Sequence, residues 1–188
     1  KASFEICQGQ ALDMLFEGRK DITEAEYLSM IGSKTGALLE ASSKVGALLG
    51  GGGPKQVKAL AEYGRLVGMA FQIRDDLLGV VGEREKFGKP IGSDIREGKR
   101  TLVIVRALKA APKKDRRKLL RVLGNRKASR TEIRQAIGVL KRSGALDYAV
   151  GKAREFVAQA KSKLGALADS EAKQFLLELA DFTVEREF

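Results

Sequence analysis

Residues 71–79 read Phe71-Gln72-Ile73-Arg74-Asp75-Asp76-Leu77-Leu78-Gly79 and lie in one of the most apolar predicted helices of the chain. Gln72, Asp75, Asp76 and Gly79 are spaced i, i+3, i+4 and i+7, so they share one helix face. Two adjacent carboxylates pointing into a helical bundle are costly unless a cation or basic partner compensates them. The alternative is an acidic pair exposed at a helix end.

The helix that carries this stretch is predicted to begin near Pro54, because proline is tolerated in a first helical turn. Apolar positions from Val57 to Val81 give it a length of about 25 residues. Upstream, Thr23 and Glu26 form a capping box that opens a long helix, which ends at the glycine run 50–53.

Downstream of this helix, the polar stretch 83–99 is interpreted as an ordered loop. Residues 101–108 favour a helix, because a lone strand in a helical chain has no partner. The remaining predicted elements are an amphipathic helix within 113–127, a helix opened by a capping box at Ser129 and Glu132, and periodic stretches at 144–167 and 170–186. We therefore predict an all-α fold of six or more helices, with residues 1–188 forming a single domain.

The composition of the 188 residues narrows the function classes. A single Cys7 excludes an internal disulfide framework, which indicates a reducing, cytoplasmic location. No apolar run has transmembrane length, so we expect no stable membrane anchoring. The absence of His excludes His-based triads and zinc sites, so any metal must be held by oxygen. The chain begins at Lys1, and we expect it to be the C-terminal part of a longer protein.

The net charge of +11 would suit an anionic partner. The densest basic run, 113–127, has apolar residues among its charges and is typical of an amphipathic helix with a solvated face. Aromatic residues make up only 6% of the chain and are absent from the basic clusters, so nothing there would stack on bases. We therefore expect no nucleic-acid partner.

The stretch Gly32-Ser33-Lys34-Thr35 invites comparison with a phosphate-binding P-loop. That motif needs a glycine directly before the lysine and another six positions before it, and Ser33 and Leu28 occupy those places. The P-loop interpretation therefore fails, but Lys34 and Thr35 still supply a cation and a hydroxyl from the middle of a predicted helix, where a buried lysine is rarely structural.

The loop after the acidic helix adds two lysines and a third carboxylate, within Gly88-Lys89-Pro90, Gly92-Ser93-Asp94 and Gly98-Lys99. Carboxylate oxygens together with lysines are typical of a site for magnesium and phosphate oxygens.

In order and spacing these residues resemble the C-terminal motifs of the trans-isoprenyl diphosphate synthases, the polyprenyl synthetase family, and in particular its short-chain geranylgeranyl and farnesyl diphosphate synthases. The matching positions, over about residues 1–108, are Gly9-Gln10 with Asp13, Lys34-Thr35, Phe71-Gln72 with Asp75-Asp76, Gly88-Lys89, Gly92, Asp94, Gly98 and Lys99. Two features depart from the pattern. Gly79 stands where the family often has a third aspartate, and the first aspartate-rich motif and the Gly-Lys-Arg region normally lie upstream of residue 1.

The resemblance implies a helical bundle of the isoprenoid synthase type, of which this chain is a part. It implies a magnesium-dependent prenyltransferase that condenses an allylic diphosphate with isopentenyl diphosphate. Asp75 would bind Mg²⁺, Asp76 would support it and Asp94 would hold metal-bound water. Lys34, Lys89 and Lys99 would contact the allylic diphosphate, and Thr35 and Gln72 would stabilise the allylic carbocation.

The same resemblance implies a homodimer and an N-terminal half that carries the rest of the site, so the isolated chain is expected to be inactive. Two alternatives remain open. One is a non-catalytic partner subunit of a heteromeric prenyl diphosphate synthase, and the other is a basic helical nucleic-acid-binding protein.

Overall fold

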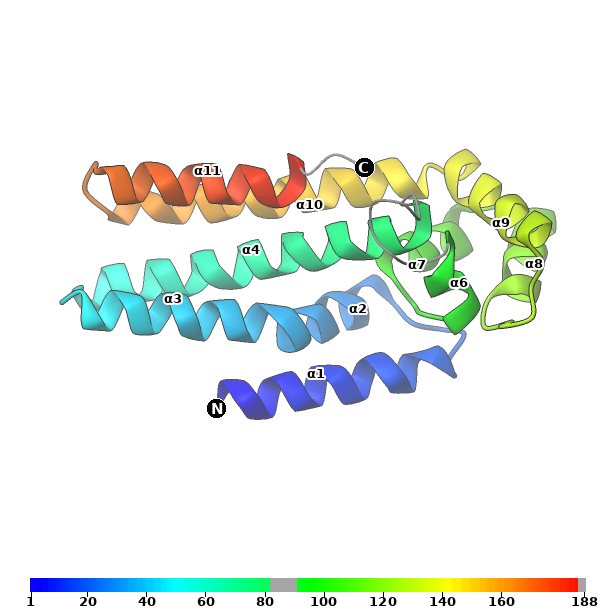
Figure 1. Cartoon of the computed structure of the whole chain (residues 1–188), viewed down its shortest axis with the longest axis horizontal. Coiled ribbons are helices and arrows are strands. Elements are labelled where there is room, and N and C mark those ends of the chain that lie inside the picture. Colours follow the sequence, from blue (N-terminus) through cyan, green and yellow to red (C-terminus); the bar gives the residue numbers. More distant parts are fainter. Residues whose placement is uncertain (82–90, 186–188) are drawn as a thin grey trace. The chain divides into compact units, whose positions relative to one another are not determined.

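The computed structural model describes residues 1–81 and 91–185, and within these ranges it contains helices and no strand (Figure 1). The predicted all-α class is confirmed. The α-helices are α1 (Ala2–Glu17), α2 (Glu24–Ile31), α3 (Ala37–Leu49), α4 (Pro54–Val81), α6 (Ser93–Glu97), α7 (Leu102–Ala110), α8 (Lys113–Val122), α9 (Arg130–Arg142), α10 (Ala145–Lys163) and α11 (Glu171–Glu185).

Most predicted boundaries agree with this list because local signals set them. Helix α4 begins at Pro54 and runs for 28 residues. Both capping boxes form: Thr23 Oγ1 accepts a hydrogen bond from the Glu26 backbone N–H at 3.2 Å, and Ser129 Oγ does the same for Glu132 at 3.2 Å. In each box the backbone N–H of the capping residue also donates a hydrogen bond to a carboxylate oxygen of the glutamate, so two backbone donors at the helix start are satisfied.

The long helix predicted from Thr23 to the glycine run is interrupted. Between α2 and α3 the chain forms a π-helical turn, η1 (Gly32–Gly36), which contains Lys34 and Thr35. A π turn inserts one extra residue per turn and is frequent at functional sites. The periodicity of apolar residues does not indicate such a single turn within a helical stretch.

The stretch predicted as a loop at 83–99 is also partly different. Its first part lies outside the described residues, but residues 93–97 form the short helix α6. Gly92 and Gly98 flank this helix with φ angles of +72° and +83°, a left-handed backbone region that favours glycine. The sequence predicts a loop here because a helix of only five residues lies between two glycines that are typical of turns.

The chain divides into two compact units, which we describe separately. The first comprises Lys1–Gln10, Leu28–Gln72 and the described residues from Lys152 to Glu185. In it α3 lies beside α4, and α11 lies beside α10 (Figure 1). Glycines allow the closest approaches: a Cβ on Gly68 of α4 would lie 2.9 Å from the Gly36 Cα. The Tyr63 hydroxyl donates to the Leu176 carbonyl at 2.6 Å, which ties α4 to α11.

The second unit comprises Ala11–Tyr27 and the described residues of Ile73–Gly151. Helix α7, predicted as a helix from its sequence, forms much of its core, since Leu102, Val103, Ile104 and Ala107 are buried. Helices α8 and α9 pack against α7 and against each other. Helix α4 contributes its last nine residues to this unit, including the two adjacent aspartates. The prediction of a single domain stays a prediction.

Candidate functional site

The two adjacent aspartates of α4 have different surroundings in the second unit. Asp76 is buried, and its Oδ2 accepts a hydrogen bond from the Tyr27 hydroxyl at 2.7 Å. Asp75 is exposed. The structure therefore buries one of the two adjacent carboxylates and exposes the other, because adjacent helical residues differ by about 100° in direction.

Tyr27 is the partner that stabilises the buried carboxylate. Its side chain is fully buried, and burial together with the nearby charges of Asp76 and Asp13 raises the pKa of its hydroxyl well above the usual value. A backbone hydrogen bond from Leu102, at the start of α7, opposes that rise. The phenol thus remains protonated and donates to Asp76, which compensates part of the cost of burying a carboxylate.

Asp94 of α6 lies directly against Gly79 of α4. A Cβ added to Gly79 would be 2.6 Å from the Asp94 Cγ, closer than any non-bonded carbon contact. Asp94 therefore occupies the space that a side chain at position 79 would take. Position 79 follows Asp76 by three residues and Asp75 by four, so it lies near both on the helix surface. The Asp94 carboxylate therefore lies beside the position where this chain has Gly79 in place of a third acidic residue.

Lys99 neutralises this carboxylate. Its Nζ lies 3.3 Å from Asp94 Oδ1 and 3.5 Å from Glu97 Oε2. Burial alone would lower the pKa of Lys99, but the charges of Asp94, Glu97 and Asp76 outweigh it and raise that pKa. Lys99 is therefore a half-buried, protonated cation within the electrostatic range of three carboxylates.

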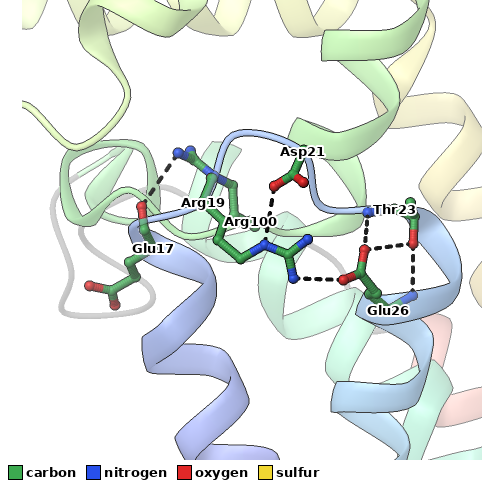
Figure 2. A network of polar contacts seen from close by, with 6 residues as sticks. All are labelled: Glu17, Arg19, Asp21, Thr23, Glu26 and Arg100. Carbon is green, nitrogen blue, oxygen red and sulfur yellow. Dashed lines mark hydrogen bonds and ion pairs between the residues drawn. The ribbon is translucent and has the colours of Figure 1, made fainter.

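A polar network fixes the segments that carry Tyr27 and Lys99 (Figure 2). Arg100, next to Lys99, donates hydrogen bonds to the backbone carbonyls of Arg19 and Glu17. Arg19 in turn contacts Asp21 at 3.1 Å and Glu26 at 2.7 Å, and Glu26 closes the cap of α2. The start of α2, which carries Tyr27, is thus held to the segment before α7.

The first unit holds the other predicted residues. The Thr35 hydroxyl donates to Gln72 Oε1 at 2.6 Å, so the π turn and α4 are joined at this point. Because the hydroxyl hydrogen points to Gln72, the Thr35 oxygen can only accept elsewhere. Lys34, expected to be buried in a helix, is half-buried in the π turn. A Cβ on Gly9 of α1 would lie 2.6 Å from the Lys34 Cα, so backbone packs on backbone here.

The metal prediction has partial support in the donor atoms. Asp76 and Asp94 offer hard oxygen ligands of the kind that magnesium prefers. Within residues 1–81 and 91–185, however, no three acidic or cysteine side chains lie close enough to hold a metal ion by themselves. Lys89 lies outside the described residues. Asp76 and Asp94 therefore fit a magnesium ion only as part of a larger ligand set.

Tyr27 is a residue of the candidate site that the sequence does not reveal. Its aromatic ring belongs to the core. Its hydroxyl partner is 49 residues away, so no local spacing could connect the two.

Comparison with known proteins shows strong similarity over almost the whole chain. The family model described as polyprenyl synthetase matches residues 1–140. A short chain isoprenyl diphosphate synthase from Methanothermobacter thermautotrophicus is 49% identical over 183 residues, which are 97% of this chain and 56% of that protein. The chain thus spans about half the length of the curated relatives that it matches.

Solved structures agree with these relatives. The crystal structure of geranylgeranyl pyrophosphate synthetase from Pyrococcus horikoshii has a TM-score of 0.91 and 44% identity, covering 99% of this chain and 56% of that one. A geranylgeranyl pyrophosphate synthase from Corynebacterium glutamicum, solved in complex with isoprenyl diphosphate and magnesium, has a TM-score of 0.90 and 30% identity, covering 97% of this chain and 52% of that one.

Proposed function

The chain belongs to the polyprenyl synthetase family, and from this premise we propose that it supplies the second aspartate-rich half of a prenyltransferase site. The reaction would join an allylic diphosphate to isopentenyl diphosphate and lengthen a linear trans-prenyl diphosphate. The observation that carries the proposal is the second unit's acidic arrangement, in which Tyr27 holds the buried Asp76 and Asp94 fills the space at Gly79 beside Lys99.

In this reaction the allylic C–O bond breaks and its electron pair leaves with the diphosphate. The double bond of isopentenyl diphosphate then attacks the allylic cation, and a proton is lost to form the new double bond. The main barrier is the negative charge that develops on the leaving group, so preplaced positive charge lowers it. We assign this work to Lys34, Lys89 and Lys99.

Magnesium, when bound, would add further positive charge at the leaving diphosphate. Asp75 and Asp76 would hold it directly or through water, and Asp94 would hold metal-bound water. Since the described residues offer no complete ligand set, diphosphate oxygens and carboxylates from elsewhere would complete it. Thr35 and Gln72 would face the allylic cation, because the Thr35 oxygen, with its hydrogen engaged, presents lone pairs.

Calorimetry of magnesium and inorganic pyrophosphate binding tests this assignment. We expect weak or no Mg²⁺ binding to the chain alone and pyrophosphate binding that requires Mg²⁺. Asp94→Asn should weaken that binding about 10- to 100-fold. The matched control is Asp147→Asn, an exposed aspartate on α10 outside the motifs, which should change nothing.

Two results would contradict the proposal. Tight stoichiometric Mg²⁺ binding without pyrophosphate would mean that the chain holds a complete metal site. If pyrophosphate affinity were the same in Asp94→Asn as in the unchanged protein, the anion would bind away from Asp94.

A further inference from the structure

The positive charge of this protein is concentrated in one segment. Residues 113–142 contain twelve Lys and Arg and only two acidic residues, so they carry a net charge of +10 out of +11 for the chain. The other 158 residues are close to neutral. Such segregation means that the excess positive charge of the protein comes almost entirely from helices α8 and α9 and their connection.

These cations all lie on the solvent side of a packed helix pair. Helix α8 buries Leu119 and Val122, and α9 buries Ile133, Val139 and Leu140. Every lysine and arginine between Lys113 and Arg142 is exposed. We call this set the basic surface.

The basic surface is not neutralised within the described part of the chain. Asp115 pairs with Arg142 at 3.1 Å and with Lys118 at 3.5 Å, and these contacts lower the pKa of Asp115. Glu132 is engaged in the cap of α9, and its hydrogen bonds with Ser129 together with the charge of Arg121 lower its pKa. The remaining ten cations form no ion pair with any described residue.

Outside the basic surface, several cations form close ion pairs with acidic side chains. Arg65 pairs with Glu40, Lys161 with Asp181 and Lys163 with Glu62, each at 2.8 Å. The unpaired cations of α8 and α9 repel one another, and an anionic partner would relieve this repulsion. The segment therefore has the electrostatics of a docking surface.

We propose that the basic surface docks the protein on an anionic phospholipid surface. Nucleic acid fits less well, because the segment contains no Phe, Tyr or Trp to stack on bases. No helix within the described residues is long and apolar enough to cross a membrane. Docking through exposed cations is reversible. The choice of lipid rests on the proposed function: a prenyl diphosphate has an apolar tail that partitions into membranes, so docking brings the enzyme to the place that accepts its product.

Vesicle co-sedimentation tests the proposal without any prenyl substrate, so its outcome is independent of the proposed function. The purified protein should bind phosphatidylglycerol vesicles and not phosphatidylcholine vesicles. Binding should fall steeply as salt rises, since screening weakens contacts between exposed charges. Each cation near an anionic surface contributes about fivefold to the binding constant.

Matched triple variants locate the contact. The first triple variant removes the positive charges from one face of α8, with the changes Lys114→Gln, Arg117→Gln and Arg121→Gln. It should weaken vesicle binding about 100-fold. Lys20→Gln, Lys44→Gln and Lys55→Gln remove three exposed lysines elsewhere and should change binding less than about threefold. If the α8 variant fails to fold, the same change at Arg130, Arg134 and Lys141 removes one face of α9.

Three outcomes would overturn the proposal. They are equal binding to both kinds of vesicle, equal losses in the two triple variants, and tighter binding of RNA or duplex DNA than of phosphatidylglycerol vesicles at the same salt.

Discussion

The Tyr27 hydroxyl decides how the buried acid of the motif is presented. A carboxylate with one oxygen held by a buried phenol has a fixed orientation. Tyr27 would act through Asp76, so we assign it the role of a positioning residue in the proposed site.

We predict that Tyr27→Phe weakens Mg²⁺-dependent pyrophosphate binding by about tenfold or more, because a hydrogen bond to a charged group contributes about 1.5–3 kcal/mol. Calorimetry at several Mg²⁺ concentrations measures this. The control is Tyr148→Phe, which removes hydrogen bonds of 2.8 and 2.9 Å to the Glu24 carboxylate outside the motif. Equal effects of the two changes would show that Tyr27 matters only for stability.

Gly79 leaves room for the Asp94 carboxylate because it has no side chain. We predict that Gly79→Ala displaces the Asp94 carboxylate and weakens Mg²⁺-dependent pyrophosphate binding, since the new methyl group would overlap that carboxylate. The control is Gly151→Ala in α10, where a Cβ meets no atom within 4 Å. That change should stabilise the fold by about 1 kcal/mol through helix propensity and leave binding unaltered. Unchanged binding in Gly79→Ala would argue against a role for Asp94.

At the level of elements, the π turn η1 brings backbone close to backbone. Gly9 of α1 packs on Lys34, and Gly36 lies against Gly68 of α4. We predict that Gly9→Ala destabilises the protein by about 1–3 kcal/mol, because backbone cannot yield to a methyl group as a flexible side chain can. Urea unfolding measures this, and Gly46→Ala in α3, where a Cβ meets open space, should be neutral or stabilising. If Gly9→Ala left the free energy of unfolding unchanged, the close packing of α1 on the π turn would not contribute to stability.

The elements also show what sequence can predict. Both capping boxes and the start of α4 at Pro54 were predicted correctly, because each depends on residues within one turn. The sequence does not predict the π turn, and the residues that pack on it, Gly9 against Lys34 and Gly68 against Gly36, are distant from it in sequence. The candidate residues were found by resemblance, whereas the different exposure of Asp75 and Asp76 and the role of Tyr27 depend on tertiary contacts.

At the scale of the whole molecule, the first unit exposes large apolar side chains. Phe4, Leu49, Phe175 and Phe182 are each at least 60% exposed, on α1, α3 and α11. Large exposed apolar side chains often mark surfaces that other polypeptide covers. The chain also spans about half of its curated relatives, and its sequence contains one aspartate-rich helix.

The last prediction is that this polypeptide alone does not condense allylic and isopentenyl diphosphates. Ionisation of the allylic diphosphate requires several preplaced cations around the leaving group, and one carboxylate cluster can orient metal on one side only. Among the described residues no second cluster could hold the opposing ions. The loss should therefore be complete and not a partial slowing of turnover.

Incorporation of radiolabelled isopentenyl diphosphate measures this, first with the polypeptide alone and then with a polypeptide that supplies the first aspartate-rich motif. We expect prenyl product only in the second case, and Asp76→Asn should abolish it there. Product from the polypeptide alone would refute the divided site. Absence of product in both cases, with pyrophosphate binding intact, would instead favour a non-catalytic partner subunit, since binding of the leaving group would then occur without the chemistry that it serves.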